Sequence, residues 1–230
     1  MSLLDRLHTE IKTIFEERPH RFFTEHDIHS ELSRIATEHL VKKGKLYVKT
    51  NDNHEVSRVH HEYPTPFRCY MKKYDFKVVT EEEFSELKSK GLRPRARRGR
   101  IDLVVLNLDF VSSNKLITVS GKTYENFRQD LAKQKYPALD LAMEVVYHPA
   151  LDKKPHSGMM EGKVASTIQD YQKLTALTEF RFPNDVCFCK EAAMFFFSNT
   201  AYKDELEEIF RKLPENKVPC FKILCPGDMR

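Results

Sequence analysis

The sequence predicts an α/β fold: a three-layer α/β/α sandwich whose central mixed β-sheet of about five strands carries helices on both faces. Two observations predict it. Helical and strand-like apolar patterns alternate through the C-terminal half, which requires crossover connections and a sheet that is at least partly parallel. The segment 191–199, EAAMFFFSN, is also a continuous apolar run, typical of a strand buried on both faces.

Length and composition are those of one globular domain. The chain has 230 residues, of which 40% are hydrophobic and 31% charged, enough to build one sizeable core. We therefore expect a single domain over 1–230. Its N-terminal helices, 1–44, should pack on a core formed by the sheet and crossover helices of 45–230.

Two amphipathic helices open the chain. The first has apolar residues at helical spacing and ends before Pro19: Leu4, Leu7, Ile11 and Ile14. The second begins after Thr24, which has the side chain of a helix N-cap, with Asp27 three residues on, and it can end at Gly44. Two such helices also occur in helix-turn-helix DNA readers, but nothing marks a recognition helix, so packing is the favoured interpretation.

The remaining elements follow from the same patterns. We expect strands at 45–50, 55–67, 100–108, 138–149, 191–199 and 218–224. We expect helices at 80–91, 123–135, 164–180 and 201–214.

The cysteines and the N-terminus argue against several protein classes. The five cysteines include no C-x-x-C pair, which disfavours a secreted disulfide scaffold and structural zinc. The opening segment is amphipathic and charged, unlike a signal peptide, and no apolar run is long enough to cross a bilayer. We expect a cytoplasmic protein without a membrane partner.

A basic stretch precedes the strand at 100–108. The segment from Lys88 to Arg100 holds seven basic residues and no acid, although the net charge of the chain is only +4. Its arginines are candidates for contacts with nucleic-acid phosphates: Arg93, Arg95, Arg97, Arg98 and Arg100. Gly91, Pro94 and Gly99 suit a solvated loop equally well, so both interpretations stay open.

Three predicted strands carry an acid in an apolar setting: Glu62, Asp102 and Glu144. If these strands are neighbours, the three carboxylates meet at one end of the sheet and repel one another. A hard divalent cation, Mg²⁺ or Mn²⁺, would relieve this repulsion and could activate water for phosphoryl displacement. The alternative for Asp102 is a strand-edge acid paired with Arg98 or Arg100.

The order of elements around these acids resembles the PD-(D/E)xK nuclease superfamily, which has the restriction-endonuclease-like fold. The resemblance covers roughly 24–224 and rests on VHHEYP, GRIDLVV and AMEVV. It implies that Asp102 and Glu144 are the acids of the second and third strands and that Glu62 is the earlier acid. It further implies catalysis of phosphodiester cleavage in nucleic acid, with the metal held by both acids and the Val145 carbonyl.

One departure from the family pattern concerns catalysis. The family has Lys two residues after the third-strand acid, whereas this chain has Val146, which cannot orient or polarise water. A partner could come from elsewhere: Lys173, which lies with Asp170 on the helix after the third strand, Lys163 at the start of that helix, or His148 on the face of Glu144. A solvated helix-face lysine is the alternative for Lys173.

Three functional hypotheses therefore stay open. The first is a nuclease whose lysine has moved to another element. The second is a nuclease fold that has lost catalysis and binds nucleic acid or a protein partner. The third is an enzyme of another class, disfavoured because no Gly-rich phosphate loop or nucleophile motif is present. A homodimer is compatible with all three.

Overall fold

The computed structural model describes the chain except for 19–20, 23, 73–74, 91–95, 123, 149–156, 183, 200–206, 208–209, 214–216 and 226–230. For 71–72, 75, 81, 124–126, 128, 148, 157–161, 163, 199 and 224–225 it describes the backbone alone. The helix expected at 201–214 lies largely outside the described residues.

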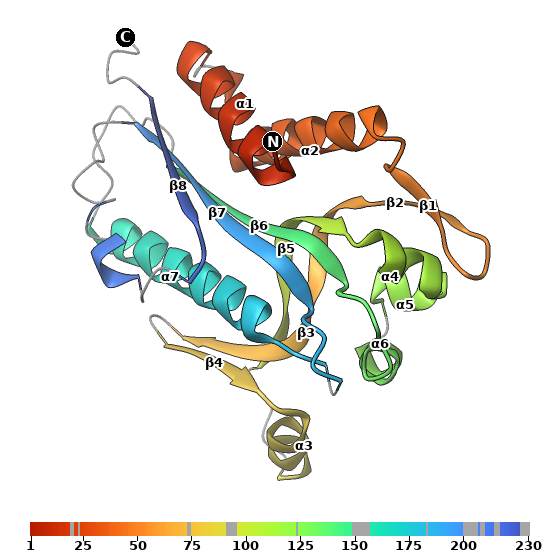
Figure 1. Ribbon diagram of the computed structural model, residues 1–230. Helices are drawn as coiled ribbons and strands as arrows, with labels where there is room; N and C mark the ends of the chain where they lie inside the picture. The colour runs from red at the N-terminus through yellow and green to blue at the C-terminus, as the bar shows by residue number, and fades with distance from the viewer. Residues whose placement is uncertain are drawn as a thin grey trace.

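The described chain contains both helices and strands (Figure 1). The helices are α1 (Leu3–Glu17), α2 (Glu25–Lys42), α3 (Glu81–Ser89), α4 (Leu108–Ser113), α5 (Leu116–Ser120), α6 (Tyr124–Leu131) and α7 (Ser157–Glu179). The strands are β1 (Tyr47–Lys49), β2 (Glu55–Ser57), β3 (Val59–Lys72), β4 (Asp75–Val79), β5 (Arg97–Leu106), β6 (Leu139–His148), β7 (Cys189–Asn199) and β8 (Cys220–Cys225).

The main sheet has six strands in the order β4-β3-β5-β6-β7-β8. Its first four strands pair antiparallel, whereas β6, β7 and β8 pair parallel, so the sheet is mixed as expected. It has one strand more than the sequence indicated, because the chain turns back after β3 and pairs β4 along it. The short strands β1 and β2 form a separate hairpin.

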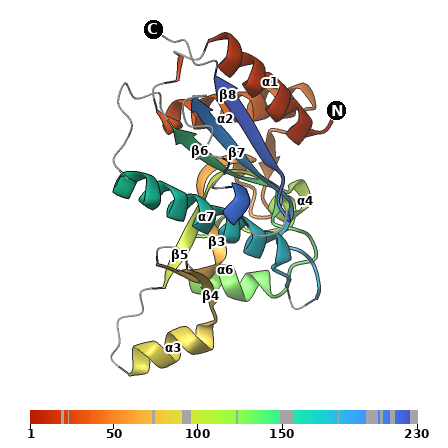
Figure 2. The same cartoon turned by 90° about the vertical axis from the view of Figure 1, so that its left-hand side faces the viewer.

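Helices lie on both faces of this sheet (Figures 1 and 2). On one face, Leu103 of β5 and Val145 of β6 belong to a buried cluster with the apolar residues of α1 and α2. On the other face, Ala142 and Val146 of β6 belong to a cluster with residues of α4, α6 and α7, including Leu174. The apolar periodicities predicted from sequence therefore bury both faces of β5 and β6.

The N-terminus of α2 is set by its cap. Thr24 Oγ1 accepts from the Asp27 backbone N–H, and Asp27 Oδ2 accepts from the Thr24 backbone N–H at 2.8 Å. This reciprocal capping box is the one that the sequence predicts, and it fixes where the first turn of α2 begins. That turn carries Glu25, and His29 follows one turn later on the same face.

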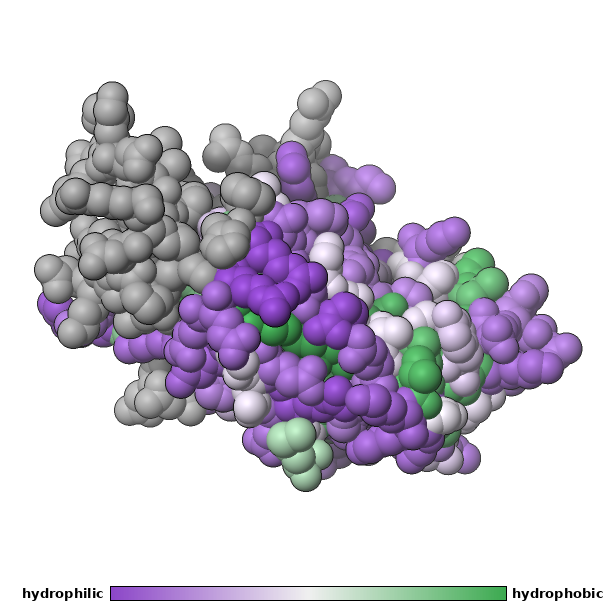
Figure 3. Space-filling model, turned by 90° about the horizontal axis from the view of Figure 1, so that it is seen from above, coloured by the Kyte–Doolittle hydropathy of each residue, from purple (hydrophilic) through white to green (hydrophobic). Residues whose placement is uncertain are grey.

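The surface on the side of α1 and α2 is mostly hydrophilic, with hydrophobic residues in small patches (Figure 3). Among the described residues, no helix combines the length and the apolar character needed to span a bilayer.

Candidate metal centre

The centre is built where β5 and β6 cease to pair through their backbones. The last residue pair between the two strands is Leu103 opposite Met143, one residue short of Asp102 and Glu144. Beyond this point the side chain of Asp102 links the two strands, because its Oδ2 accepts a hydrogen bond from the Val145 backbone N–H at 2.9 Å. A carboxylate is thereby fixed between the two strands, at the position that the sequence singled out.

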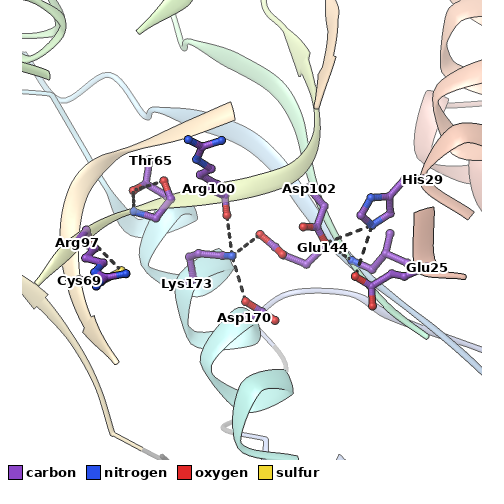
Figure 4. Close-up of polar contacts among 12 residues, drawn as sticks. Glu25, His29, Thr65, Cys69, Arg97, Arg100, Asp102, Glu144, Asp170 and Lys173 are labelled. Carbon is purple, nitrogen blue, oxygen red and sulfur yellow. Dashed lines mark hydrogen bonds and ion pairs between the residues drawn. The ribbon is translucent and has the colours of Figure 1, made fainter. Parts of the chain in front are cut away.

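Helix α2 contributes two further groups from above the sheet. His29 Nε2 lies 3.6 Å from Asp102 Oδ2 and 4.0 Å from Glu25 Oε1. The ligand atoms of Glu25, His29 and Asp102 all lie within 4.8 Å of one another. Figure 4 shows the three side chains gathered together. Glu25 and His29 are four residues apart in a helix, so they share one face. These three side chains could hold a metal ion.

The buried nitrogen of His29 is the most informative atom in this triad. Nε2 is buried and has no hydrogen-bond partner among the described residues. At 3.6 Å, its contact with Asp102 is an ionic approach and too long for a hydrogen bond. Buried polar atoms normally have a partner. A metal ion bound by the Nε2 lone pair would supply one.

Helix α7 contributes a lysine from the opposite face. Lys173 Nζ lies 2.7 Å from Glu144 Oε1, and donates to Asp170 Oδ1 at 3.0 Å and to the Arg100 carbonyl oxygen at 2.7 Å (Figure 4). Lys173 is 6% exposed and Glu144 is 2% exposed. The alternative of a solvated lysine is therefore wrong for Lys173. Its ammonium group contacts Glu144, the acid of β6, so it stays a candidate replacement for the lysine of the family motif.

Gly99 makes room for this lysine. A Cβ at Gly99 would lie 3.3 Å from Cδ of Lys173 and 3.1 Å from Cγ2 of Thr65. The aliphatic part of Lys173 therefore passes over a position of β5 that has no side chain.

A pocket of about 270 Å³ lies between the two groups of side chains. Its walls come from α2, β5, β6 and α7, and they include Glu25, Asp102, Glu144 and Lys173. Val146 also lines it, so an apolar wall stands where the family pattern has a lysine. Val145 lines the pocket as well, but its described polar contact is the N–H donated to Asp102, and the role of its carbonyl stays a prediction.

Negative charge is in excess in this cluster. It contains four carboxylates and two basic groups: Glu25, Asp102, Glu144 and Asp170, with His29 and Lys173. With all four carboxyl groups ionised, four negative charges against two positive charges would leave −2 when His29 is protonated and −3 when it is neutral. Carboxylates packed this closely repel one another, and a divalent cation would offset most of the excess.

The pKa values on the α7 side reflect burial and this crowding. Burial raises the pKa of Glu144 well above its ordinary value; Lys173 opposes the rise, and the charges of Asp102 and Asp170 add to it. Burial raises the pKa of Asp170 as well, against the effect of Lys173. Burial alone would lower the pKa of Lys173, but the two carboxylates outweigh it and the pKa is raised. Lys173 is therefore a fixed cation at neutral pH.

The pKa values on the α2 side diverge. Burial favours the neutral form of Asp102, but His29 and the Val145 N–H outweigh it, so the pKa of this carboxyl is lowered. Burial disfavours charge on His29 too, but Asp102 and Glu25 raise the imidazole pKa above its ordinary value. Burial and the nearby Asp102 raise the pKa of Glu25. Asp102 is therefore the carboxylate most firmly ionised.

Glu62 does not join the cluster. Its side chain is 56% exposed, and its Oε2 lies 3.6 Å from Arg100 Nη1, outside the pocket. Its backbone has a φ of +53°, uncommon for a residue with a side chain and an interruption within β3. The third carboxylate near Asp102 is instead Glu25, which sequence reasoning missed. The available signal was Glu25 and His29 at i, i+4 directly after a predicted N-cap.

The remaining predicted site residues have mixed outcomes. Asp102 contacts His29 and the Val145 N–H, so its alternative as a partner of Arg98 or Arg100 is wrong. The side chains of His148 and Lys163 lie outside what the structure describes.

The arginines of the basic stretch, predicted to contact phosphates, also have mixed outcomes. Arg93 and Arg95 are outside the described residues. Arg98 is built into the fold: its guanidinium donates to the carbonyl oxygens of Thr65 at 2.7 Å and Gly121 at 2.6 Å, and it lies 4.5 Å from the ring centroid of Phe127. The prediction of phosphate contact is corrected for Arg98, because these contacts hold it against the protein. Arg97 and Arg100 are exposed.

Comparison of the chain with protein-family models, with curated proteins and with solved structures finds no match. The likeness to PD-(D/E)xK nucleases therefore rests on the residues and the element order of this chain alone.

Proposed function

We propose that this protein is a metal-dependent phosphodiesterase that cleaves nucleic acid at the Asp102 cluster. The observation that carries the proposal is the buried Nε2 of His29, which has no hydrogen-bond partner in the described part of the chain and lies among carboxylates. The succession of α2, β3, β5, β6, α7, β7 and β8 also supports a restriction-endonuclease-like core in a three-layer α/β/α sandwich.

The donor set fits a divalent ion. Glu25, His29 and Asp102 would hold it, and the nearby Glu144 and Val145, whose carbonyl is a further candidate ligand, line the pocket. Carboxylate oxygens suit Mg²⁺, whereas an imidazole nitrogen favours a transition metal, so the set favours Mn²⁺ over Mg²⁺. When bound, such an ion makes water more acidic and offsets negative charge on a phosphate.

Lys173 takes the role that Val146 cannot perform. Two hydrogen bonds, to the Arg100 carbonyl oxygen and to Asp170, and an ionic contact with Glu144 hold its ammonium group in place, and its raised pKa keeps it protonated. It cannot accept a proton as a base, but as a fixed cation it can orient water or offset charge on the scissile phosphate. Glu144, whose pKa is raised by burial, is the better proton acceptor.

A second function is favoured by one observation. Lys173 already neutralises Glu144 through an ionic contact of 2.7 Å without any metal. That pair would suit a nuclease-like fold that has lost catalysis and binds nucleic acid or a protein partner. The two functions differ in whether phosphodiester bonds break.

Cleavage of single- and double-stranded DNA and RNA in Mg²⁺ or Mn²⁺ tests the proposal. We expect cleavage by the wild type and none by Asp102→Asn, because the amide keeps the shape of the carboxyl group and loses its charge. The matched control is Asp109→Asn, on α4 outside the pocket, which should cleave normally. Cleavage that survives in Asp102→Asn would place the active site elsewhere, and no cleavage of any substrate by the wild type would favour the second function.

A further inference from the structure

A second pocket, of about 680 Å³, is built by the segment that connects β5 to β6. It is lined mainly by residues of 113–136, in and around α4, α5 and α6, with Asn51 from the turn between β1 and β2. It shares no lining residue with the metal centre. In the chain these helices follow the end of β5 at Leu106 and precede the start of β6 at Leu139, and Figure 1 shows them grouped to one side of the main sheet.

The wall of this pocket is held by side-chain amides. Asn114 Nδ2 donates to Gln134 Oε1 at 2.8 Å, and Gln134 Nε2 donates back to Asn114 Oδ1 at 2.9 Å. Gln134 also donates to the Asp130 carbonyl oxygen at 2.8 Å, and it is only 6% exposed. These bonds join α4 to the end of α6 and give the pocket a fixed shape.

The pocket is positively charged. Three exposed lysines line it, Lys115, Lys133 and Lys135, and none forms an ion pair with a described residue. The one acid in the lining is Asp130, whose Oδ2 accepts from the Thr118 hydroxyl. Three positive charges against one negative charge leave +2. A phosphate-bearing ligand would complement this charge.

An aromatic ring lies among these lysines. Tyr136 lines the pocket and is 39% exposed, next to Lys135 in sequence and three residues from Lys133. Exposed rings flanked by cations are the platforms on which unpaired bases stack while the phosphates contact the cations. Duplex DNA keeps its bases stacked inside and would leave this ring unused.

We propose that this pocket binds a single strand of nucleic acid, with phosphates on Lys115, Lys133 and Lys135 and a base stacked on Tyr136. The inference rests on the proposed function only in that the strand would be the substrate; the pocket needs no metal. Asp102 lies roughly four residues, or about 13 Å, along β5 from Leu106, where the connecting segment begins. A nucleic-acid strand held in the pocket would therefore have to extend well beyond the pocket to reach the metal centre.

Fluorescence anisotropy with a labelled single strand of about 12 nucleotides, without divalent ions, tests the proposal. We expect Lys133→Glu to weaken binding about tenfold or more, because a phosphate contact becomes a repulsion. Tyr136→Ala should weaken it roughly 5- to 150-fold and Tyr136→Phe hardly at all, since the ring is what stacks. The matched control is Lys12→Glu, the same charge change at an exposed position of α1, which should bind like the wild type.

The outcomes separate this inference from the proposed function. Unchanged affinity in Lys133→Glu and Tyr136→Ala would overturn the pocket, even if the protein cleaves nucleic acid. Weakened binding in both variants would support it, even if no substrate is cleaved. Loss in Lys133→Glu with no effect of Tyr136→Ala, and equal competition by heparin, would mean a general polyanion surface and would also overturn the proposal. All exchanged residues are exposed, so we expect the variants to fold, as circular dichroism can confirm.

Discussion

At the residue scale, His29 is the group on which the metal proposal depends most. Its Nε2 faces two carboxylates at distances too long for hydrogen bonds, and burial removes water as a substitute partner. Without a metal, the negative charges of Asp102 and Glu25 favour the imidazolium form, and they raise the pKa of His29. A metal would require the neutral ring, so the proton and the ion would compete for one nitrogen.

We expect His29→Ala to lower the affinity for Mn²⁺ by at least roughly 10- to 100-fold, measured by calorimetry. His26→Ala is the matched control, because His26 lies three residues before His29 on α2 and outside the triad. This variant should bind Mn²⁺ like the wild type. In the wild type, affinity should fall as the pH drops through the raised pKa of His29, by up to about tenfold per pH unit, because the imidazolium has no lone pair. Equal affinity in His29→Ala would remove His29 from the ligand set.

Lys173 is the second decisive residue, because the buried carboxylate of Glu144 and the half-buried carboxylate of Asp170 depend on it. In Lys173→Met, Glu144 and Asp170 lose their buried cation, which should lower the free energy of unfolding by about 3 to 5 kcal/mol without metal. Denaturant unfolding measures this loss, and we expect Mn²⁺ to restore part of it. Lys90→Met, which breaks an exposed pair with Glu86, should change stability by less than about 1 kcal/mol. A Lys173→Met protein as stable as the wild type would contradict the buried contacts described above.

At the scale of elements, the N-terminus of α2 connects local sequence to the centre. The capping box of Thr24 and Asp27 fixes the start of α2, where Glu25 lies in the first turn and His29 directly after it. The sequence could predict this cap, because its residues lie three apart. It could not show that the turn lies over Asp102, because that contact joins positions more than seventy residues apart in the chain.

Thr24→Ala tests this connection. Loss of the cap should lower stability by about 0.5 to 2 kcal/mol and also weaken Mn²⁺ binding, because the first turn of α2 would fray. Thr80 forms the same capping box with Glu83 at α3, which carries no residue of the centre. Thr80→Ala should therefore cost similar stability and leave Mn²⁺ affinity unchanged. Equal Mn²⁺ affinity in both variants would mean that the cap does not position the ligands.

At the scale of the whole molecule, much of the arrangement follows from sequence. The amphipathic patterns and the apolar run of β7 were sufficient for an α/β fold with a mixed sheet, since burial of both faces dictates where apolar residues recur. The pairing of β4 with β3 was missed, because strand pairing depends on register across a turn. The sequence also selected Asp102, Glu144 and Lys173, which the fold brings together.

Sequence reasoning assigned Glu62 wrongly to the centre and missed Glu25, because residue order does not show which acid the fold brings to Asp102. Glu62 and Glu25 are both acids preceding β5, and sequence order cannot decide between them. The fold decides, because Glu62 has a positive φ and pairs outward with Arg100, whereas α2 directs Glu25 toward Asp102. Sequence also left the role of Arg98 open between phosphate contact and a structural role, and the fold decides it because the carbonyl oxygens of Thr65 and Gly121 accept its hydrogen bonds.

The central claim is that Glu25, His29 and Asp102 bind a divalent ion together. Anomalous X-ray diffraction from crystals soaked in Mn²⁺ tests it most directly, because the method locates the ion itself. We expect a manganese peak within bonding distance of His29 Nε2 and Asp102 Oδ2, and no such peak in Asp102→Asn crystals treated identically. Wild-type crystals without a peak at this position, or with manganese only elsewhere, would contradict the account.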